Sequence, residues 1–160
     1  MIIRPWLVIA IVTFVVSLGS WFFKPRQDLP WATRLNLPRW LATIEPAIPF
    51  IWTAIFVTGA WSASIVWAHD PGSLKTWLLM GAYLIVEIIT VAYIPLTLRL
   101  QSLAIGTVLG GVGAVLGIFL TLIVLQISGQ AALLLLPYVI WSPIGTYATR
   151  KLIDLNPEAV

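Results

Sequence analysis

The sequence has no cysteine and a single histidine, and these two absences exclude several kinds of chemistry. Without cysteine there is no disulfide, no thiolate nucleophile and no cysteine-based metal site. His69 stands beside Asp70-Pro71-Gly72, a run typical of a turn after a helix, and no Ser–His–acid set can be assembled around it. Paired acids spaced for glycoside hydrolysis and glycine-rich phosphate loops are also missing. We therefore assign no catalytic residue and no metal site, and we expect no required cofactor.

Charged residues are scarce as well. They make up 9% of the chain, whereas 60% of the residues are hydrophobic, and the mean hydropathy is +0.99. A soluble domain carries roughly 25% charged residues, so this chain cannot cover itself with a wetted surface. The composition predicts an integral membrane protein whose partner is membrane lipid, and the net charge of +3 does not indicate nucleic-acid binding.

The strict alternation of a membrane β-strand is absent, and the apolar segments are too long for such strands. A helix needs about 20 apolar residues to cross a bilayer. Five segments reach or approach this length, at about 6–23, 48–67, 77–98, 103–125 and 131–149. We interpret the first as a retained helix, because it ends in bulky Trp21-Phe22-Phe23 and not in the small residues of a signal cleavage site. The prediction is an all-α membrane protein, a single domain over 1–160 with five transmembrane helices and a long loop between the first two.

The nine basic residues are unevenly distributed between the two ends of such a bundle. With five spans, Arg4 and Lys75 fall on one side, and the other side holds Lys24, Arg26, Arg34, Arg39, Arg99, Arg150 and Lys151. Basic residues concentrate on the cytoplasmic side of membrane proteins. We expect loop 24–47 and the C-terminus to be cytoplasmic.

The segment 31–53 is the one sizeable polar stretch, and it contains three tryptophans and three prolines. A loop this long is usually functional or disordered, and its aromatic content argues against disorder. Trp52 near its end and Phe56 just after it fall on one face of the second helix, and large flat rings suit flat conjugated ligands. Arg34 and Arg39 have two interpretations: they bind carboxylates of such a ligand, or they only follow the distribution of positive charge. We expect the segment to act as a lid.

Glu87 stands close to the middle of the third helix, on one face with Tyr83 and Thr90. An acid at this depth is costly, so it should face protein or water and not lipid. Two interpretations remain open. Glu87 is a hydrogen-bonded link between helices, or it lines a ligand cavity or a proton path.

Four glycines in the fourth helix, Gly106, Gly110, Gly113 and Gly117, fall on one face. Such a smooth face lets another helix approach closely. We expect tight packing within the chain, together with a homodimer through some face.

Three runs and one proline carry a resemblance to a known family. The runs are Trp31 to Trp40 in the loop, Pro49 to Thr53 at the start of the second helix and Pro137 to Trp141 in the fifth, and the proline is Pro95 in the third. Together they resemble the TspO/MBR family, the translocator proteins that include the peripheral-type benzodiazepine receptor, and they suggest a bacterial-type member. The chain departs from the family pattern at Leu37, where lysine is usual, and in lacking a Pro-Pro pair in the loop. Tyr93, Thr90 and Ala148-Thr149 also stand where Trp, Asn and Leu-Asn are usual.

The resemblance implies a five-helix bundle with a ligand cavity that opens toward the first loop. The family's ligands are porphyrins and sterols, and its bacterial members are linked to stress responses and to light-dependent porphyrin breakdown. The residues carried over by motif are Trp31, Trp40, Trp52, Tyr138, Trp141 and Gly145, with Phe56 at a position that is often aromatic. The predicted ligand-binding set adds Arg34, Pro38, Arg39, Glu87, Thr90 and Tyr93.

The expected function is therefore a membrane receptor or carrier for tetrapyrroles such as protoporphyrin IX, with sterol-like lipids as a second ligand class. An alternative is photochemical porphyrin degradation, for which Trp31 and Trp141 are the candidate residues. Another is a scaffold that uses the glycine face of the fourth helix.

Overall fold

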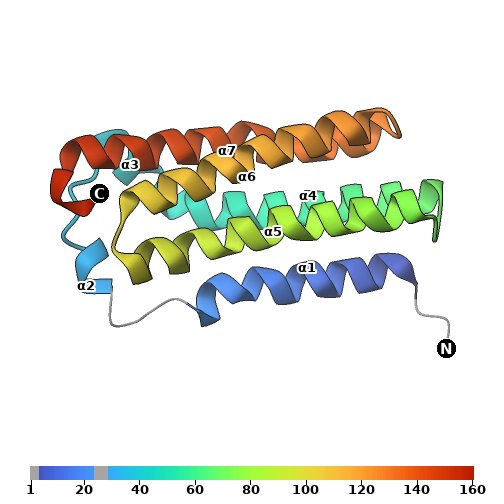
Figure 1. The fold of residues 1–160 in the computed structure, drawn as a ribbon, viewed down its shortest axis with the longest axis horizontal. Coiled ribbons are helices and arrows are strands. Elements are labelled where there is room, and N and C mark those ends of the chain that lie inside the picture. The colour runs from blue at the N-terminus through green and yellow to red at the C-terminus, as the bar shows by residue number, and fades with distance from the viewer. Residues whose placement is uncertain (1–3, 24–28) are drawn as a thin grey trace.

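The computed structural model describes residues 4–23 and 29–160, and Figure 1 shows them as a bundle of long helices. In this part of the chain the long helices are α1 (Pro5–Phe22), α4 (Ile48–His69), α5 (Leu74–Leu100), α6 (Leu103–Leu125) and α7 (Gly129–Leu155). The described residues form no strand. Helices α4 to α7 are long and apolar enough to cross a membrane, and α1 is a shorter apolar helix. The predicted all-α membrane bundle is confirmed; basic Lys24 and Arg26 lie outside the described residues.

The predicted limits of 103–125 agree with α6, whereas α5 and α7 extend beyond their predicted segments at both ends. The reason is that polar residues continue these helices after the apolar stretch ends. Helices α5, α6 and α7 each begin at a serine cap: the hydroxyls of Ser73, Ser102 and Ser128 accept backbone N–H groups three residues ahead, over 3.1–3.3 Å.

The long loop contains short helices: α2 (Leu29–Ala32), α3 (Arg39–Ile44) and the 3-10 turn η2 (Glu45–Ala47). The last two lead directly into α4, so that one helical span runs over the 31 residues Arg39–His69. Pro46 and Pro49 stand in the first turns of η2 and α4, where their missing N–H groups leave no helical hydrogen bond unmade. After α7 the chain closes with a second 3-10 turn, η3 (Pro157–Ala159).

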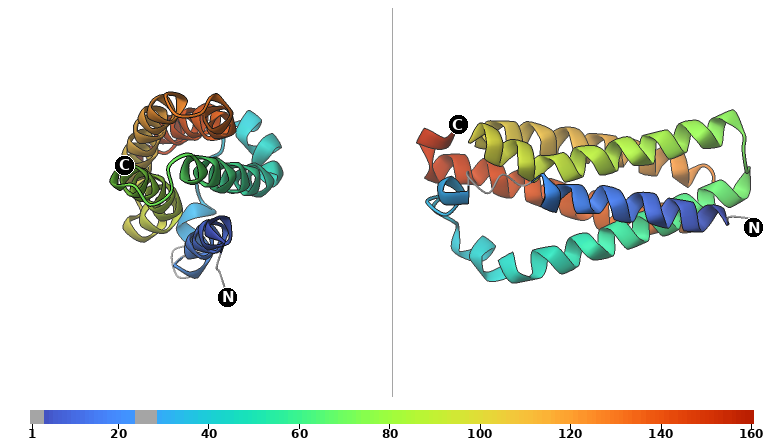
Figure 2. Two further views of the ribbon diagram at one scale, coloured as in Figure 1. Left: turned by 90° about the vertical axis from the view of Figure 1, so that its right-hand side faces the viewer. Right: turned by 90° about the horizontal axis from the view of Figure 1, so that it is seen from below.

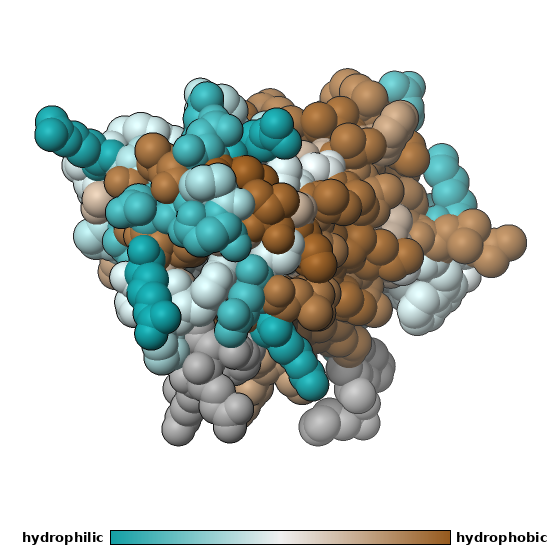
Figure 3. Space-filling model, turned by 60° about the vertical axis from the view of Figure 1, so that its left-hand side comes forward, coloured by the Kyte–Doolittle hydropathy of each residue, from teal (hydrophilic) through white to brown (hydrophobic). Residues whose placement is uncertain are grey.

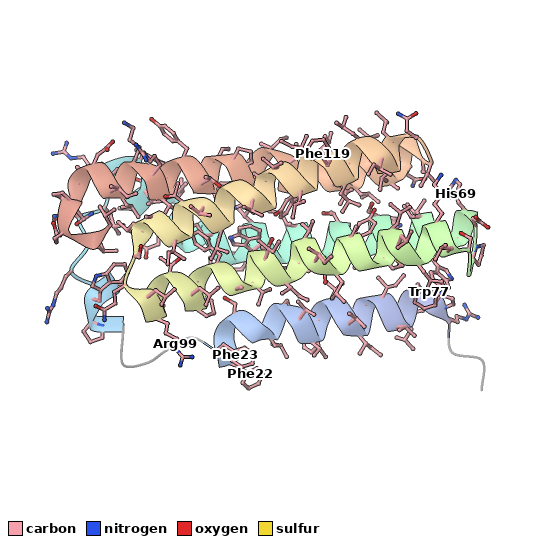
Figure 4. All side chains as sticks on the ribbon, in the orientation of Figure 1. Phe22, Phe23, His69, Trp77, Arg99 and Phe119 are labelled. Carbon is pink, nitrogen blue, oxygen red and sulfur yellow. The ribbon has the colours of Figure 1, made fainter. Side chains whose placement is uncertain are left out.

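Helices α4, α7, α6 and α5 form a ring in that order, and α1 packs outside it against α4 and α5 (Figure 2). One end of the bundle carries α2, α3, the α5–α6 turn and the C-terminus, and we call it the loop end. The other carries the start of α1 and the α4–α5 and α6–α7 turns, and we call it the turn end. In Figure 4 Arg99 lies toward the loop end and His69 and Trp77 lie at the turn end. The structure thus places the first loop and the C-terminus together; their cytoplasmic side stays a prediction.

The glycine face of α6 packs within the chain, as expected. A Cβ atom at Gly110 would lie 2.6 Å from Thr146 Oγ1, and one at Gly117 would lie 2.2 Å from Cε1 of Tyr138, both on α7. Only glycine allows this approach of α7. Because α7 covers this face, it is not available for a scaffold partner, and the predicted homodimer would need another face.

Candidate ligand-binding site

A cavity of about 1320 Å³ opens inside the bundle. It starts below α3 at the loop end and continues between α4, α5 and α7, with a branch along the groove between α1 and α4. This volume exceeds the roughly 300–1,000 Å³ of common ligand pockets, so the space suits a large molecule. In Figure 3 hydrophilic residues gather over the loop end, whereas hydrophobic residues cover the flank of the bundle.

Aromatic rings form one wall of the cavity. Trp52 lies edge-on to Tyr138, with ring centroids 6.4 Å apart and planes at 63°, and its centroid is 6.2 Å from that of Phe56. Trp141 lines the cavity beside Tyr138 on α7, and Trp40 reaches it from α3. These rings come from three helices and offer a broad apolar surface to one space.

The polar groups of the cavity are hydroxyls and the indole N–H groups of its tryptophans, and the protons of several hydroxyls are already used. Thr90 donates to the carbonyl of Val86 over 2.8 Å, and the hydroxyl of Tyr138 lies 3.1 Å from Thr90 Oγ1. Because the threonine proton goes to the carbonyl, Tyr138 must be the donor to Thr90. Thr149 likewise donates to Gly145, so that Tyr93 donates to Thr149. These bonds hold α5 against α7.

None of the described residues that line the large cavity is an Asp, Glu, Lys, Arg or His. An ion placed inside would have no opposite charge to compensate its lost hydration. The cavity therefore suits an apolar or weakly polar molecule, and ionised groups of a ligand would have to lie at its mouth.

The structure brings most of the predicted site residues together in this cavity, namely Trp40, Trp52, Phe56, Thr90, Tyr93, Tyr138, Trp141 and Gly145. At Gly145 a Cβ atom would meet nothing within 4 Å, so the missing side chain leaves open space on this side. Five other predicted residues do not line the cavity: Trp31, Arg34, Pro38, Arg39 and Glu87. Trp31 is half-buried in α2, and both arginines are exposed at the loop end.

The loop is tied to the end of α7 through Asn156, which is completely buried. Its Oδ1 accepts the backbone N–H of Asn36 over 2.7 Å, and its Nδ2 donates to the carbonyls of Asn36 (3.1 Å) and Leu152 (2.8 Å). We call this pair the Asn36–Asn156 tie. It holds the loop segment between α2 and α3 in place. It was not predicted, because nothing in a single sequence couples two asparagines 120 residues apart.

Ser142, Thr146 and Thr149 also line the cavity. None of them was in the predicted ligand-binding set, although Thr149 departs from the family pattern. The signal for them was present: they recur at helical spacing beside Gly145 on the same face as Tyr138 and Trp141. Apolar Ile89 and Leu109 gave no comparable signal, since they resemble every other aliphatic residue of their helices.

Glu87 links two helices. Thr13 on α1 donates to Glu87 Oε1 on α5 over 2.7 Å, and Thr13 is buried. The first of its two interpretations, a hydrogen-bonded link between helices, is thus observed.

The fold and the cavity define a multi-pass, all-α integral membrane protein with an internal aromatic-walled space beneath a structured loop. The chain belongs to the TspO/MBR family, whose family model matches residues 7–153. It is also similar to the uncharacterized membrane protein YtaB of Bacillus subtilis (strain 168), with 26% identity over 152 residues that cover 94% of this chain and 95% of that protein.

Proposed function

We propose that this protein is a membrane receptor or carrier that binds a tetrapyrrole in the large cavity, in a stress-related pathway of tetrapyrrole regulation. The observation that supports this most is the wall of Trp40, Trp52, Tyr138 and Trp141 around a space of about 1320 Å³. A flat conjugated macrocycle buries a large apolar area against such rings at little cost in conformational entropy. Tetrapyrrole binding is also the general function of the family.

The charge-free lining sets the orientation of the ligand. The macrocycle would lie among the aromatic rings, and its carboxylates would point out of the cavity toward the loop end. Arg34 and Arg39 are exposed at that end and supply guanidinium groups that pair well with carboxylates. The same uncharged lining suits a sterol-like lipid as a second ligand class.

The test is a titration of the purified protein, in nanodiscs of neutral lipid, with protoporphyrin IX in the dark. We expect saturable quenching of tryptophan fluorescence, corrected with empty nanodiscs. Trp52→Leu should weaken binding about three- to tenfold, since an aromatic contact contributes about 0.5–1.5 kcal/mol. Trp77→Leu is the matched control, because Trp77 is exposed at the turn end and lines no part of the cavity. Absence of saturable binding would contradict the proposal.

Photochemical degradation of the porphyrin is a second candidate, because Trp141 lies in the cavity wall whereas Trp31 does not. Under light, a carrier leaves the porphyrin absorbance stable. If the absorbance instead decays, and the decay stops in Trp141→Phe but continues in Trp31→Phe, the activity is photochemical and depends on the cavity.

A further inference from the structure

A second cavity, of about 40 Å³, lies where α4, α5, α6 and α7 meet, and we call it the Glu87 pocket. Its polar lining residues are Tyr83, Glu87, Thr90 and Tyr138, and the rest of its lining is apolar or glycine. Phe56, Thr90 and Tyr138 line both this pocket and the large cavity. The two spaces are therefore neighbours that share one wall.

The hydroxyl protons around the Glu87 pocket are all used. Ser62 donates to the carbonyl of Ala131 over 2.7 Å, so Tyr83, whose hydroxyl is 2.6 Å from Ser62 Oγ, must donate to that oxygen. Tyr138 donates to Thr90 by the same reasoning, and Thr90 donates to Val86. The oxygen of Tyr83 keeps an unused lone pair, whereas that of Tyr138 also interacts with the hydroxyl of Ser142. The pocket therefore offers acceptors and, among its described lining residues, no free hydroxyl donor.

Glu87 adds the strongest of these acceptors. Thr13 donates to Oε1, and Oε2 has no hydrogen-bond partner among the described residues. Among the described residues, every buried side-chain oxygen or nitrogen has a hydrogen-bond partner. Because Oε2 has none, it is not fully buried and must be accessible to a water-sized group. Glu87 lines the pocket, so a group placed there lies beside a carboxyl group that still has one accessible, unpaired oxygen.

The pocket admits one small group. A space of about 10–15 Å³ is enough to hold one water molecule, so a pocket of about 40 Å³ admits a group on the scale of a water molecule, a hydroxyl or an ammonium. Gly59 forms part of its wall, and a Cβ atom built there would meet nothing within 4 Å. A larger residue at this position would take up the same space.

We propose that the Glu87 pocket binds a hydrogen-bond donor, either an ammonium or a hydroxyl group, carried at one end of a flat apolar ligand held in the large cavity. The acceptors of Glu87, Tyr83 and Tyr138 would receive its protons. An ammonium would also neutralise an ionised carboxylate. This inference rests on the proposed ligand cavity, and it gives that cavity selectivity for ligands with one polar end.

Three probes of nearly equal shape test it: 1-methylpyrene, 1-pyrenemethanol and 1-pyrenemethylamine, each titrated into the protein in neutral-lipid nanodiscs. Binding is followed by tryptophan quenching against empty nanodiscs. We expect at least one donor probe to bind about tenfold more tightly than 1-methylpyrene, a ratio that corresponds to about 1.4 kcal/mol. A preference for the amine indicates an ionised carboxylate, and a preference for the alcohol indicates hydrogen bonding without a charge.

Two variants locate the preference. Glu87→Met removes the carboxyl group at similar length, and Gly59→Ala places a methyl group in the pocket. Both should abolish the preference for the donor probe while 1-methylpyrene binds as before. Gly111→Ala is the control for Gly59→Ala, because a Cβ atom at Gly111 also meets nothing within 4 Å but Gly111 lines neither cavity.

Equal affinity for all three probes, or a preference that persists in both variants, would overturn the proposal and leave the large cavity as a binding site. If no pyrene binds at all, the pocket proposal falls too. Protoporphyrin binding then decides separately whether the proposed function stands.

Discussion

The two halves of the four-helix ring differ although the same helices form both. Toward the turn end the interior is filled by small and branched side chains, and Ser62, Val66, Val124 and Ala131 have almost no exposed surface. Toward the loop end α5, α6 and α7 are lined by aromatic, glycine and threonine residues around the large cavity. A packed core in one half thus gives way to a hollow interior in the other along a single bundle.

The hydroxyl groups are also used differently. In the filled half, Ser62 connects α4 to α5 and α7 through Tyr83 and the carbonyl of Ala131. In the hollow half, Thr146 donates to a carbonyl of its own helix, and Thr149 does the same while it accepts the hydroxyl of Tyr93 on α5. Such local bonds satisfy a hydroxyl without closing the space beside it. We infer that the filled half supplies most of the stability and that the hollow half is free to bind, so mutations should separate the two properties.

The largest effect is expected at the border between the halves, where Gly117 meets the ring of Tyr138. Gly117→Val would drive a methyl-bearing carbon into that ring, because even a Cβ atom would lie 2.2 Å from Cε1. Overpacking of this kind costs about 1–3 kcal/mol and occasionally more. We expect a loss of about 3 kcal/mol in the free energy of unfolding, measured by thermal denaturation in detergent, together with weaker porphyrin binding as Tyr138 shifts.

Gly111→Val is the matched control on the same helix, since a Cβ atom there meets nothing within 4 Å. It should leave both properties nearly unchanged. Equal effects of the two substitutions would mean that the contact between α6 and α7 is not what the glycine face provides.

A smaller effect is expected from Ser62→Ala, which leaves the buried hydroxyl of Tyr83 without its acceptor. Hydrogen bonds between membrane helices contribute about 0.6–2 kcal/mol. We expect a loss of about 1 kcal/mol in the free energy of unfolding with unchanged affinity for protoporphyrin. Ser64→Ala is the opposite case. Ser64 lines the large cavity, and its hydroxyl donates only to the carbonyl of Ala60 in its own helix. We expect Ser64→Ala to change at most the affinity for protoporphyrin and to leave the free energy of unfolding unchanged.

Composition and periodicity predicted the fold well. Apolar length identifies a membrane helix, as the agreement at Leu103–Leu125 shows, and helical spacing identified the glycine face before its partner on α7 was known. The aromatic residues of the cavity were found through motifs that they share with a family. Their meeting in one space could not be derived from spacing, because it depends on the order of α4, α7, α6 and α5 in the ring.

The loop was the least predictable part. Its arginines were chosen for their chemistry and Trp31 was carried over by motif, and the structure places all three outside the cavity lining. The contacts that position the loop belong to Asn36 and Asn156, whose partners are backbone atoms far away in sequence. Every residue type except proline offers the same backbone N–H and C=O groups. The sequence therefore does not reveal which backbone groups bind a distant side chain.

A small effect on stability, together with the most specific effect on binding, is expected from Asn156→Ala. The substitution breaks the Asn36–Asn156 tie, but Asn36 is exposed at the loop end, where water can replace the lost partner. The free energy of unfolding should fall by only about 0.5–1.5 kcal/mol. The loop above the hollow half loses its anchor on α7, however, so we expect protoporphyrin to dissociate several-fold faster in a stopped-flow displacement experiment.

Asp154→Ala controls for changes near this end of α7, because it removes only the exposed pair of Asp154 with Lys151, at 3.1 Å, which should contribute little. An unchanged dissociation rate in Asn156→Ala would show that the tie belongs to the scaffold alone and that the loop does not control entry to the cavity.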